Sequence, residues 1–200
     1  TSPALTSRDI IEKRIKLADS AIEKTGLNIF HGLYAGITAD PKQIEQVVEA
    51  YYEFFPRVVG LKMFAGHSTG NMGIIKEEEQ RLVYTALADI GYMGLLAVHC
   101  EKERFIKNNL FDPEKPVTHT LARSHDAEVE SVIDQVDFAV EGNYKGILHI
   151  CHISVPESLK VIEETRDEIV KFKITCGITP HHTLLYDKMM EGKEGLLLKM

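Results

Sequence analysis

Hydrophobic positions along the chain recur at two spacings, one typical of helices and the other typical of strands. The first helix is predicted to begin after Ser7 and to end at Gly26, because apolar residues recur at helical spacing between them and glycine suits a left-handed C-terminal position. The next helix is predicted to begin at Asp40, an N-cap residue that is followed by proline at the first helical position. The helical period returns in three later segments, which are residues 77–90, residues 126–140 and the segment that Pro156 opens.

Short apolar segments lie between these helices and are predicted to be strands. They cover residues 28–37, 58–64, 94–99, 146–153 and 170–176. In the last segment Phe172, Ile174 and Cys176 alternate with polar residues, which indicates a strand exposed on one side over its first half. Because strands and amphipathic helices alternate along the chain, we expect βαβ crossovers and a parallel sheet.

A parallel sheet of this kind is either doubly wound or closed as a barrel, and the pattern alone does not choose between them. No GxGxxG motif follows the first strand and no P-loop occurs, so the usual nucleotide-binding reasons for an open sheet are missing. A closed barrel of eight units needs about 250 residues. We therefore expect an α/β fold in the form of a partial TIM-type (β/α)8 barrel, with about five parallel strands and outer helices. It would be a single, incomplete catalytic-barrel domain over residues 1–200.

Composition narrows the class of protein. With 44% hydrophobic and 26% charged residues, the 200-residue chain is expected to be an ordinary globular domain. A net charge of −7 and scattered Lys and Arg residues argue against nucleic acid and favour a small-molecule substrate. The apolar runs fall short of the roughly 20 residues that span a bilayer, so no membrane role is expected. Three cysteines without CxxC spacing favour reduced thiols and a cytoplasmic location.

Three polar residues stand where apolar strands end, namely Lys62, His99 and His152. The carboxyl ends of the strands in a parallel barrel converge on the mouth of the active site. One such residue alone is more often structural, but recurrence on three successive strands favours a shared function. A lysine inside an apolar strand needs a charged partner, a shifted pKa or a covalent modification, and imidazole suits zinc. We therefore predict that these three side chains point into one cavity and bind metal.

Other histidines receive a structural interpretation. His149 lies three residues before His152, so strand alternation should aim the two at opposite faces and leave His149 packed against the helices. The adjacent pair His181 and His182 is also expected to be structural, because neighbouring residues rarely aim at one point.

The sequence does not assign a single role to two segments near the predicted mouth of the barrel. The glycine-rich stretch 65–73 could contact a substrate anion or the metal site, or it could form a tight turn. The long connection 101–125 lies where specificity elements commonly sit, and it adds His119 and Arg123 as further candidates. Cys100 and Cys151, beside two of the candidate ligands, are expected to be buried apolar thiols.

Four motifs together resemble dihydroorotase, a family of the amidohydrolase superfamily. They are Gly-Leu-Lys-Met-Phe-Ala-Gly-His-Ser-Thr-Gly-Asn-Met (60–72), Val-His-Cys-Glu (98–101), His-Ile-Cys-His-Ile-Ser (149–154) and Gly-Ile-Thr-Pro-His-His (177–182). Their order and spacing match the family over essentially all 200 residues.

This resemblance implies two zinc ions bridged by a carboxylated Lys62 and a hydroxide, with His99 and His152 among the histidine ligands. A carbamate would turn the ammonium group of Lys62 into a bidentate oxygen ligand. The family also has a strand with the pattern Asp-x-His-x-His-x-Arg and a last strand bearing the general-base aspartate, and neither lies within these residues. The base is expected beyond residue 200, so no catalytic or substrate-binding residue is assigned and the 200 residues alone are expected to be inactive.

The implied reaction is the reversible cyclisation of N-carbamoyl-L-aspartate to dihydroorotate in pyrimidine biosynthesis. A related cyclic amidase, hydantoinase or allantoinase, would share the lysine and the histidines, and the stretch 68–71 favours dihydroorotase. A non-catalytic barrel that serves as a scaffold is the alternative from another class, and retention of Lys62, His99 and His152 argues against it. A homodimer and an association with aspartate transcarbamoylase both stay open.

Overall fold

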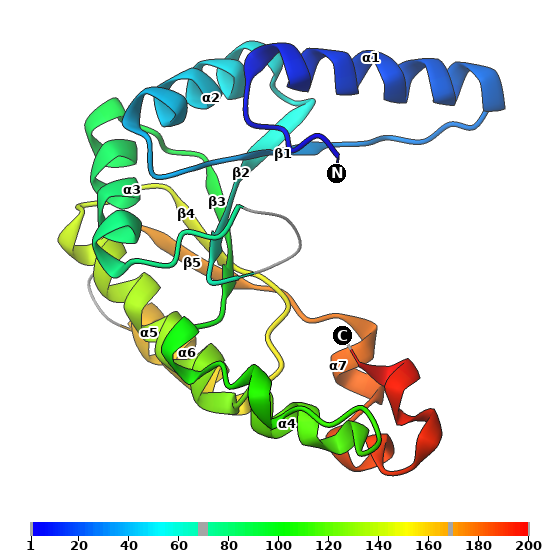
Figure 1. Cartoon of the computed structure of the whole chain (residues 1–200). Coiled ribbons are helices and arrows are strands. Elements are labelled where there is room, and N and C mark those ends of the chain that lie inside the picture. The colour runs from blue at the N-terminus through cyan, green and yellow to red at the C-terminus, as the bar shows by residue number, and fades with distance from the viewer. Residues whose placement is uncertain (1, 68–71, 168–169, 200) are drawn as a thin grey trace.

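The computed structural model describes residues 2–67, 72–167 and 170–199, and its centre is a five-stranded parallel sheet (Figure 1). The strands are β1 (Leu33–Gly36), β2 (Val58–Ala65), β3 (Leu95–Cys100), β4 (Ile147–Ile150) and β5 (Lys173–Cys176). They lie side by side in the order β1-β2-β3-β4-β5, and every neighbouring pair is parallel.

Helices fill the connections between the strands. The α-helices are α1 (Arg8–Thr25), α2 (Pro41–Phe54), α3 (Glu77–Ile90), α4 (His119–Ala122), α5 (His125–Glu141), α6 (Pro156–Asp167) and α7 (Pro180–Leu184). Short 3-10 helices lie in the connection after β3, at η1 (Glu103–Phe105), η2 (Asn108–Leu110) and η3 (Pro116–Thr118), and near the end of the chain, at η4 (Asp187–Met190) and η5 (Lys193–Leu198). No helix in the described part of the chain is both long enough and apolar enough to cross a membrane.

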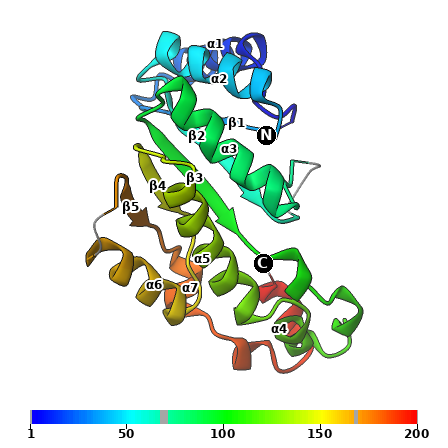
Figure 2. The ribbon, with the colours of Figure 1, turned by 90° about the vertical axis from the view of Figure 1, so that its left-hand side faces the viewer.

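The winding of the sheet identifies the architecture. Consecutive strands are neighbours throughout, so the sheet has no point where the strand order reverses, as a doubly wound sheet would have. The crossover helices α2, α3, α5 and α6 pack next to one another along one face of the sheet (Figure 2). This singly wound arrangement is that of a (β/α)8 barrel, and the sheet is not closed. The predicted partial barrel is therefore confirmed.

Local signals in the sequence place the first helices correctly. Helix α1 ends at Gly26, whose φ of 65° is the left-handed conformation expected of a C-terminal glycine. At the start of α2, the side chain of Asp40 accepts a hydrogen bond from the backbone N–H of Lys42 at 3.0 Å. Ser7 occupies the N-cap position of α1 but makes no side-chain capping bond.

Three strands are shorter than the sequence predicts, and β5 begins at Lys173, three residues after its predicted start. Strand β1 covers four residues, because the preceding segment leaves Leu27, Ile29 and Phe30 exposed and away from the sheet. Figure 1 shows this segment returning along α1, which projects beyond the sheet. Strand β4 ends at Ile150, three residues before the predicted end, and this early end changes the direction of His152, as described below.

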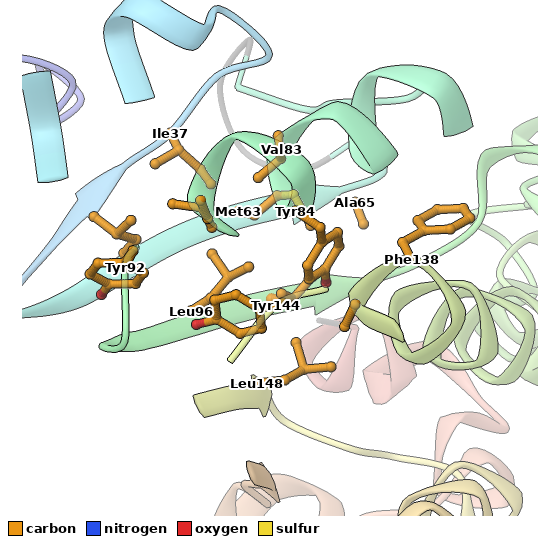
Figure 3. Close-up of a cluster of buried hydrophobic side chains, with 14 of the residues drawn as sticks. Ile37, Met63, Ala65, Val83, Tyr84, Tyr92, Leu96, Phe138, Tyr144 and Leu148 are labelled. Atoms are coloured by element: carbon orange, nitrogen blue, oxygen red, sulfur yellow. The ribbon is translucent and has the colours of Figure 1, made fainter. Parts of the chain in front are cut away.

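The hydrophobic core lies between the sheet and the helices (Figure 3). Alternate strand residues face the helices and are fully buried, among them Leu61, Met63, Leu96, Val98, Leu148 and Ile150. One buried polar network crosses this core. The hydroxyl of Tyr84 donates to Gln135 at 2.9 Å, and the Gln135 amide donates to Gln80 at 2.8 Å, so α3 and α5 are joined by satisfied hydrogen bonds.

Two tyrosines repeat one arrangement at the amino-terminal ends of β3 and β4. The hydroxyl of Tyr92 donates to the carbonyl of Leu95 at 2.9 Å, and the hydroxyl of Tyr144 donates to the carbonyl of Gly94 at 2.8 Å. Each ring lies against the glycine two residues later, since a Cβ on Gly146 would lie 2.4 Å from the Tyr144 oxygen. The Tyr-x-Gly spacing therefore matches a packing contact that the hydrophobic pattern alone did not indicate.

The sheet face opposite the helices is here called the inner face. The strand register aligns Lys62, Ala97, His149 and Thr175 in one row across β2, β3, β4 and β5. The next row toward the carboxyl ends contains Phe64 and His99. Because these residues alternate with the buried, helix-facing ones, their side chains belong to the inner face.

Candidate functional site

The candidate site lies at the carboxyl ends of β3 and β4, where two histidine rings meet. His99 Nδ1 and His152 Nε2 are 3.2 Å apart, and the ring centroids are 5.0 Å apart. His99 is the fifth residue of β3, whereas His152 stands two residues past the end of β4. The sequence prediction that the two histidines lie close together therefore agrees with the geometry.

His152 reaches His99 because its backbone leaves the strand conformation. Its φ is 38°, in the left-handed region that few residues other than glycine adopt. Strand alternation therefore stops before His152, and it does not aim His149 and His152 at opposite faces.

The expectation that His149 packs against the helices is wrong. His149 lies in the same inner-face row as Lys62, and its Nδ1 is 2.9 Å from the hydroxyl oxygen of Thr175. Its strand neighbours Leu148 and Ile150 face the helices instead. The prediction failed because it counted from His152 as though the strand continued to that residue.

Lys62 lies on the inner face of β2, beside the two histidines. Its ammonium group donates a hydrogen bond to Cys151 Sγ at 3.1 Å and lies 4.9 Å from the centroid of the Phe64 ring. Strand β2 continues to Ala65, so Lys62 lies three residues before the strand end rather than at it. Cys151 is half-buried and contacts Lys62, whereas Cys100 is buried as predicted. All three cysteines are unpaired.

Electrostatics favour the neutral forms of His152 and His149. Partial burial lowers the pKa of His152, and the neighbouring His99, Lys62 and His182 lower it further. Burial and the charge of Lys62 also lower the pKa of His149. Neutral imidazole is the form that binds metal ions.

A half-buried ion pair between Glu101 and Arg123 lies next to His99. The guanidinium Nε of Arg123 donates to Glu101 Oε1 at 2.7 Å, and a second guanidinium nitrogen contacts Oε2. Burial alone would raise the pKa of the Glu101 carboxyl, but its contacts with His99 and Arg123 outweigh burial and bring the pKa to about 2. Arg123, a candidate from the sequence, is therefore engaged by this carboxylate, and His119 is held in an edge-to-face contact with Phe111.

The distances allow a test of whether the site fits zinc. At zinc–nitrogen bond lengths of about 2.0–2.1 Å, two nitrogens on one tetrahedral ion lie about 3.3 Å apart, close to the 3.2 Å between His99 and His152. His99 Nε2 is 3.4 Å from Glu101 Oε2, yet it has no hydrogen-bond partner among the described residues. No group of three His, Cys, Asp or Glu residues with metal-binding geometry occurs in the described part of the chain. Two imidazoles thus fit one ion, and further ligands would have to come from elsewhere.

Two neighbours of the site were not assigned to it from the sequence, since Glu101 received no role and His182 a structural one. The ring of His182 lies 6.5 Å from that of His152, and Glu101 lies against His99. The Val-His-Cys-Glu motif already contained Glu101, so spacing could have suggested it. His182 is held by Thr179, whose hydroxyl oxygen is 3.2 Å from its Nδ1. Residues 68–71, which favoured dihydroorotase over related amidases, lie outside the described residues.

Comparisons with known proteins find sequence relatives that are named dihydroorotase. The chain is 28% identical over 190 residues to the dihydroorotase of Ehrlichia chaffeensis, covering 94% of this chain and 38% of that protein. It is 27% identical over 159 residues to the dihydroorotase of Methanothermobacter thermautotrophicus, covering 77% of this chain and 32% of that protein. It is 33% identical over 131 residues to the dihydroorotase of Pyrococcus furiosus, covering 64% of this chain and 26% of that protein. The chain thus spans between about a quarter and two fifths of these relatives. No family model matches the chain.

Solved structures show the fold. The L-hydantoinase (dihydropyrimidinase) from Arthrobacter aurescens superposes with a TM-score of 0.69 at 18% identity, over 90% of this chain and 38% of the hydantoinase. The D-hydantoinase from Bacillus sp. AR9 superposes with a TM-score of 0.67 at 16% identity, over 82% of this chain and 35% of the hydantoinase. The fold is therefore that of part of a TIM barrel.

The sequence relatives add a narrower relationship. Their shared name confirms the resemblance to dihydroorotase that the four motifs suggested, and the chain matches part of the length of each of these proteins.

Proposed function

We propose that residues 1–200 form the central part of a zinc-dependent dihydroorotase, as a single catalytic-barrel domain. The observation that carries this proposal is the approach of His99 Nδ1 to within 3.2 Å of His152 Nε2, at the carboxyl ends of parallel strands. Lys62 on the adjacent strand and relatives named dihydroorotase support it. The substrate is a small cyclic amide, and three unpaired thiols support a cytoplasmic location.

In this proposal His99, His152 and a carboxylated Lys62 would be the residues of this chain that hold zinc. Bound zinc would polarise the ring amide carbonyl and supply hydroxide near neutral pH. The described residues prepare the site by lowering the pKa of His152 and by holding its ring beside that of His99. Lys62 faces a thiol and an aromatic ring, with no carboxylate bonded to it among the described residues. An ammonium group in that setting gains from conversion to a carbamate that binds metal.

A hydantoinase is the second candidate, because solved hydantoinases share the fold. At 16–18% identity they bear on the fold alone, whereas the sequence relatives at 27–33% identity carry the name dihydroorotase. The preferred substrate is therefore dihydroorotate, in the reversible cyclisation of N-carbamoyl-L-aspartate. A homodimer or a complex with aspartate transcarbamoylase remains compatible with this function.

The proposal is tested by assaying two proteins in parallel with added zinc and bicarbonate. One is the 200-residue chain, and the other is a longer protein that extends it at both ends to the length of its relatives. Dihydroorotate loss is followed, with hydantoin and allantoin as competing substrates. We expect turnover by the longer protein and negligible turnover by the shorter one, because general acid–base help worth roughly 10²- to 10⁴-fold would come from outside these residues. Preferential hydrolysis of hydantoin would contradict the proposed dihydroorotase function and favour a hydantoinase.

The role of Lys62 is tested by Lys62→Ala in the longer protein, with Lys173→Ala as the matched control. Both lysines lie on the inner face, but Lys173 is exposed and lies one inner-face row below Thr175, farther from the carboxyl ends of the strands. Lys62→Ala is expected to lower turnover and zinc content together by about 10²-fold or more, whereas Lys173→Ala should change neither. Full activity in Lys62→Ala would remove the bridging carbamate from the proposal.

A further inference from the structure

The left-handed backbone of His152 needs an explanation from its surroundings. A histidine at a φ of 38° is strained, and such a conformation persists only where neighbouring contacts hold it. The backbone on either side of His152 is fixed by the sheet. The N–H of Cys151 donates to the carbonyl of Val98 at 2.9 Å, and the N–H of Ile153 donates to the carbonyl of Gly177 at 2.8 Å.

The remainder of this segment is held by one carboxylate. Glu128, in the first turn of α5, accepts hydrogen bonds from the N–H of Ser154 at 3.0 Å, the hydroxyl of Ser154 at 2.6 Å and the N–H of Val155 at 3.1 Å. In Figure 2 the segment between β4 and α6 runs alongside α5, the helix that carries Glu128. Among the described residues, Glu128 is the one side chain of another residue that bonds the backbone of residues 151–155.

We propose that Glu128 is a positioning residue that holds the His152 segment in its left-handed turn and thereby keeps the His152 ring against His99. A carboxylate suits this task because it accepts several hydrogen bonds at once and donates none. Its anchor, α5, is packed into the core through Val132, Val136 and Phe138, so the carboxylate is attached to a rigid element. The importance of this position for catalysis rests on the proposed role of His152 as a metal ligand.

The positioning role is tested without metal by nuclear magnetic resonance. In the full 200-residue chain labelled at histidine, the carbon-bound ring protons of His99 and His152 should show a nuclear Overhauser effect, since their ring centroids are 5.0 Å apart. Glu128→Gln keeps the shape of the side chain but turns an N–H₂ group toward donors. We expect it to reduce this cross-peak at least twofold, and Ser154→Ala, which removes the shortest of the three bonds, to reduce it by a smaller amount.

Glu130→Gln is the matched control, because Glu130 lies on the same helix and pairs with Arg104 instead of the His152 segment. The control should keep the cross-peak at full strength. Circular dichroism establishes whether each variant is folded. If Glu128→Gln does not fold, Ser154→Ala decides the test. A cross-peak of unchanged strength in the folded variants would overturn the proposal.

A zinc measurement separates this inference from the proposed function. In chelator competition on the longer protein, Glu128→Gln should weaken zinc binding roughly tenfold or more, as loss of a supporting contact typically does, while Glu130→Gln should not. If the cross-peak falls as expected but the unmodified protein binds no zinc, the proposed function fails and the positioning role stands. If zinc binds normally and the cross-peak does not respond to Glu128→Gln, the positioning role fails alone.

Discussion

At the scale of single residues, the three cysteines occupy different environments although they look alike in sequence. Cys100 faces the helix side of β3 and is buried, and burial together with the nearby Cys151 raises the pKa of its thiol. Cys151 and Cys176 are half-buried. Because the thiolate is the reactive form, these environments should separate the chemical reactivities of the three residues.

We predict that iodoacetamide at pH 8 modifies Cys151 and Cys176 faster than Cys100, by about tenfold or more, since Cys100 is less accessible and burial raises the pKa of its thiol. Mass spectrometry of digests taken at successive times measures the three rates. In urea, where burial is lost, the rates should become similar. Rapid labelling of Cys100 in the folded chain would contradict the buried position of that thiol.

The Glu101–Arg123 pair provides a second prediction at this scale. Arg123→Ala leaves the Glu101 carboxylate largely buried without its partner, which should lower the free energy of unfolding by about 2 kcal/mol, somewhat less than the 3–5 kcal/mol of a fully buried pair. Arg104→Ala breaks an exposed pair with Glu130 and should cost about 1 kcal/mol or less. Urea titration followed by circular dichroism compares the two variants. Equal losses would show that Glu101 is hydrated after the substitution.

At the scale of elements, helix ends and strand starts depend on particular residues as well as on periodicity. Gly26 ends α1 through its positive φ and would place an added Cβ in open space. Gly146 instead lets the ring of Tyr144 pack beside the start of β4. The two glycines are therefore required for different reasons, one conformational and one steric.

This difference predicts unequal effects of the same substitution. Gly26→Ala should cost about 1 kcal/mol of unfolding free energy, the usual penalty for alanine in a left-handed conformation. Gly146→Ala should cost about 2–4 kcal/mol, because the new methyl group would lie 2.4 Å from both the Gly94 carbonyl oxygen and the Tyr144 hydroxyl, which are hydrogen-bonded to each other. Chemical denaturation of both variants measures the difference. A Gly146→Ala protein as stable as Gly26→Ala would mean that the Gly94 backbone and the Tyr144 ring both move aside at little cost.

At the scale of the whole molecule, the sheet has two outer strands. Over the described residues, β1 and β5 each pair with one neighbour, although the carbonyl of Leu5 accepts a hydrogen bond from the N–H of Gly36 and covers part of β1. The outer side of β5 has no strand partner there. Unpaired strand edges readily add a further strand.

We therefore predict that the 200-residue chain associates as its concentration rises, through the β5 edge. Sedimentation velocity over a range of concentrations would show a growing average mass. Thr175→Lys adds charge to the inner face next to the edge and should reduce association. A constant monomer mass at all concentrations would show that the edge is protected.

The sequence by itself determined the order of elements and the residue types at the candidate site. Hydrophobic periodicity located the helices and strands, because each period reports which face of an element is buried. The motifs around Lys62, His99 and His152 indicated the amidohydrolase relationship, because the order and type of these residues can be compared with a family without knowing the fold. The missing nucleotide-binding motifs favoured a barrel over a doubly wound sheet, and the singly wound sheet agrees.

Tertiary structure alone decided how these residues meet. The register of β2, β3 and β4 depends on hydrogen bonds between strands far apart in sequence, and it put His149 on the inner face, contrary to expectation. The end of β4 and the left-handed turn at His152 depend on contacts from Val98, Gly177 and Glu128, none of which is local to that segment. Periodicity describes how side chains alternate while an element lasts. Where an element stops is decided by the neighbours that pair with it, so the position of His152 could be determined only in the folded chain.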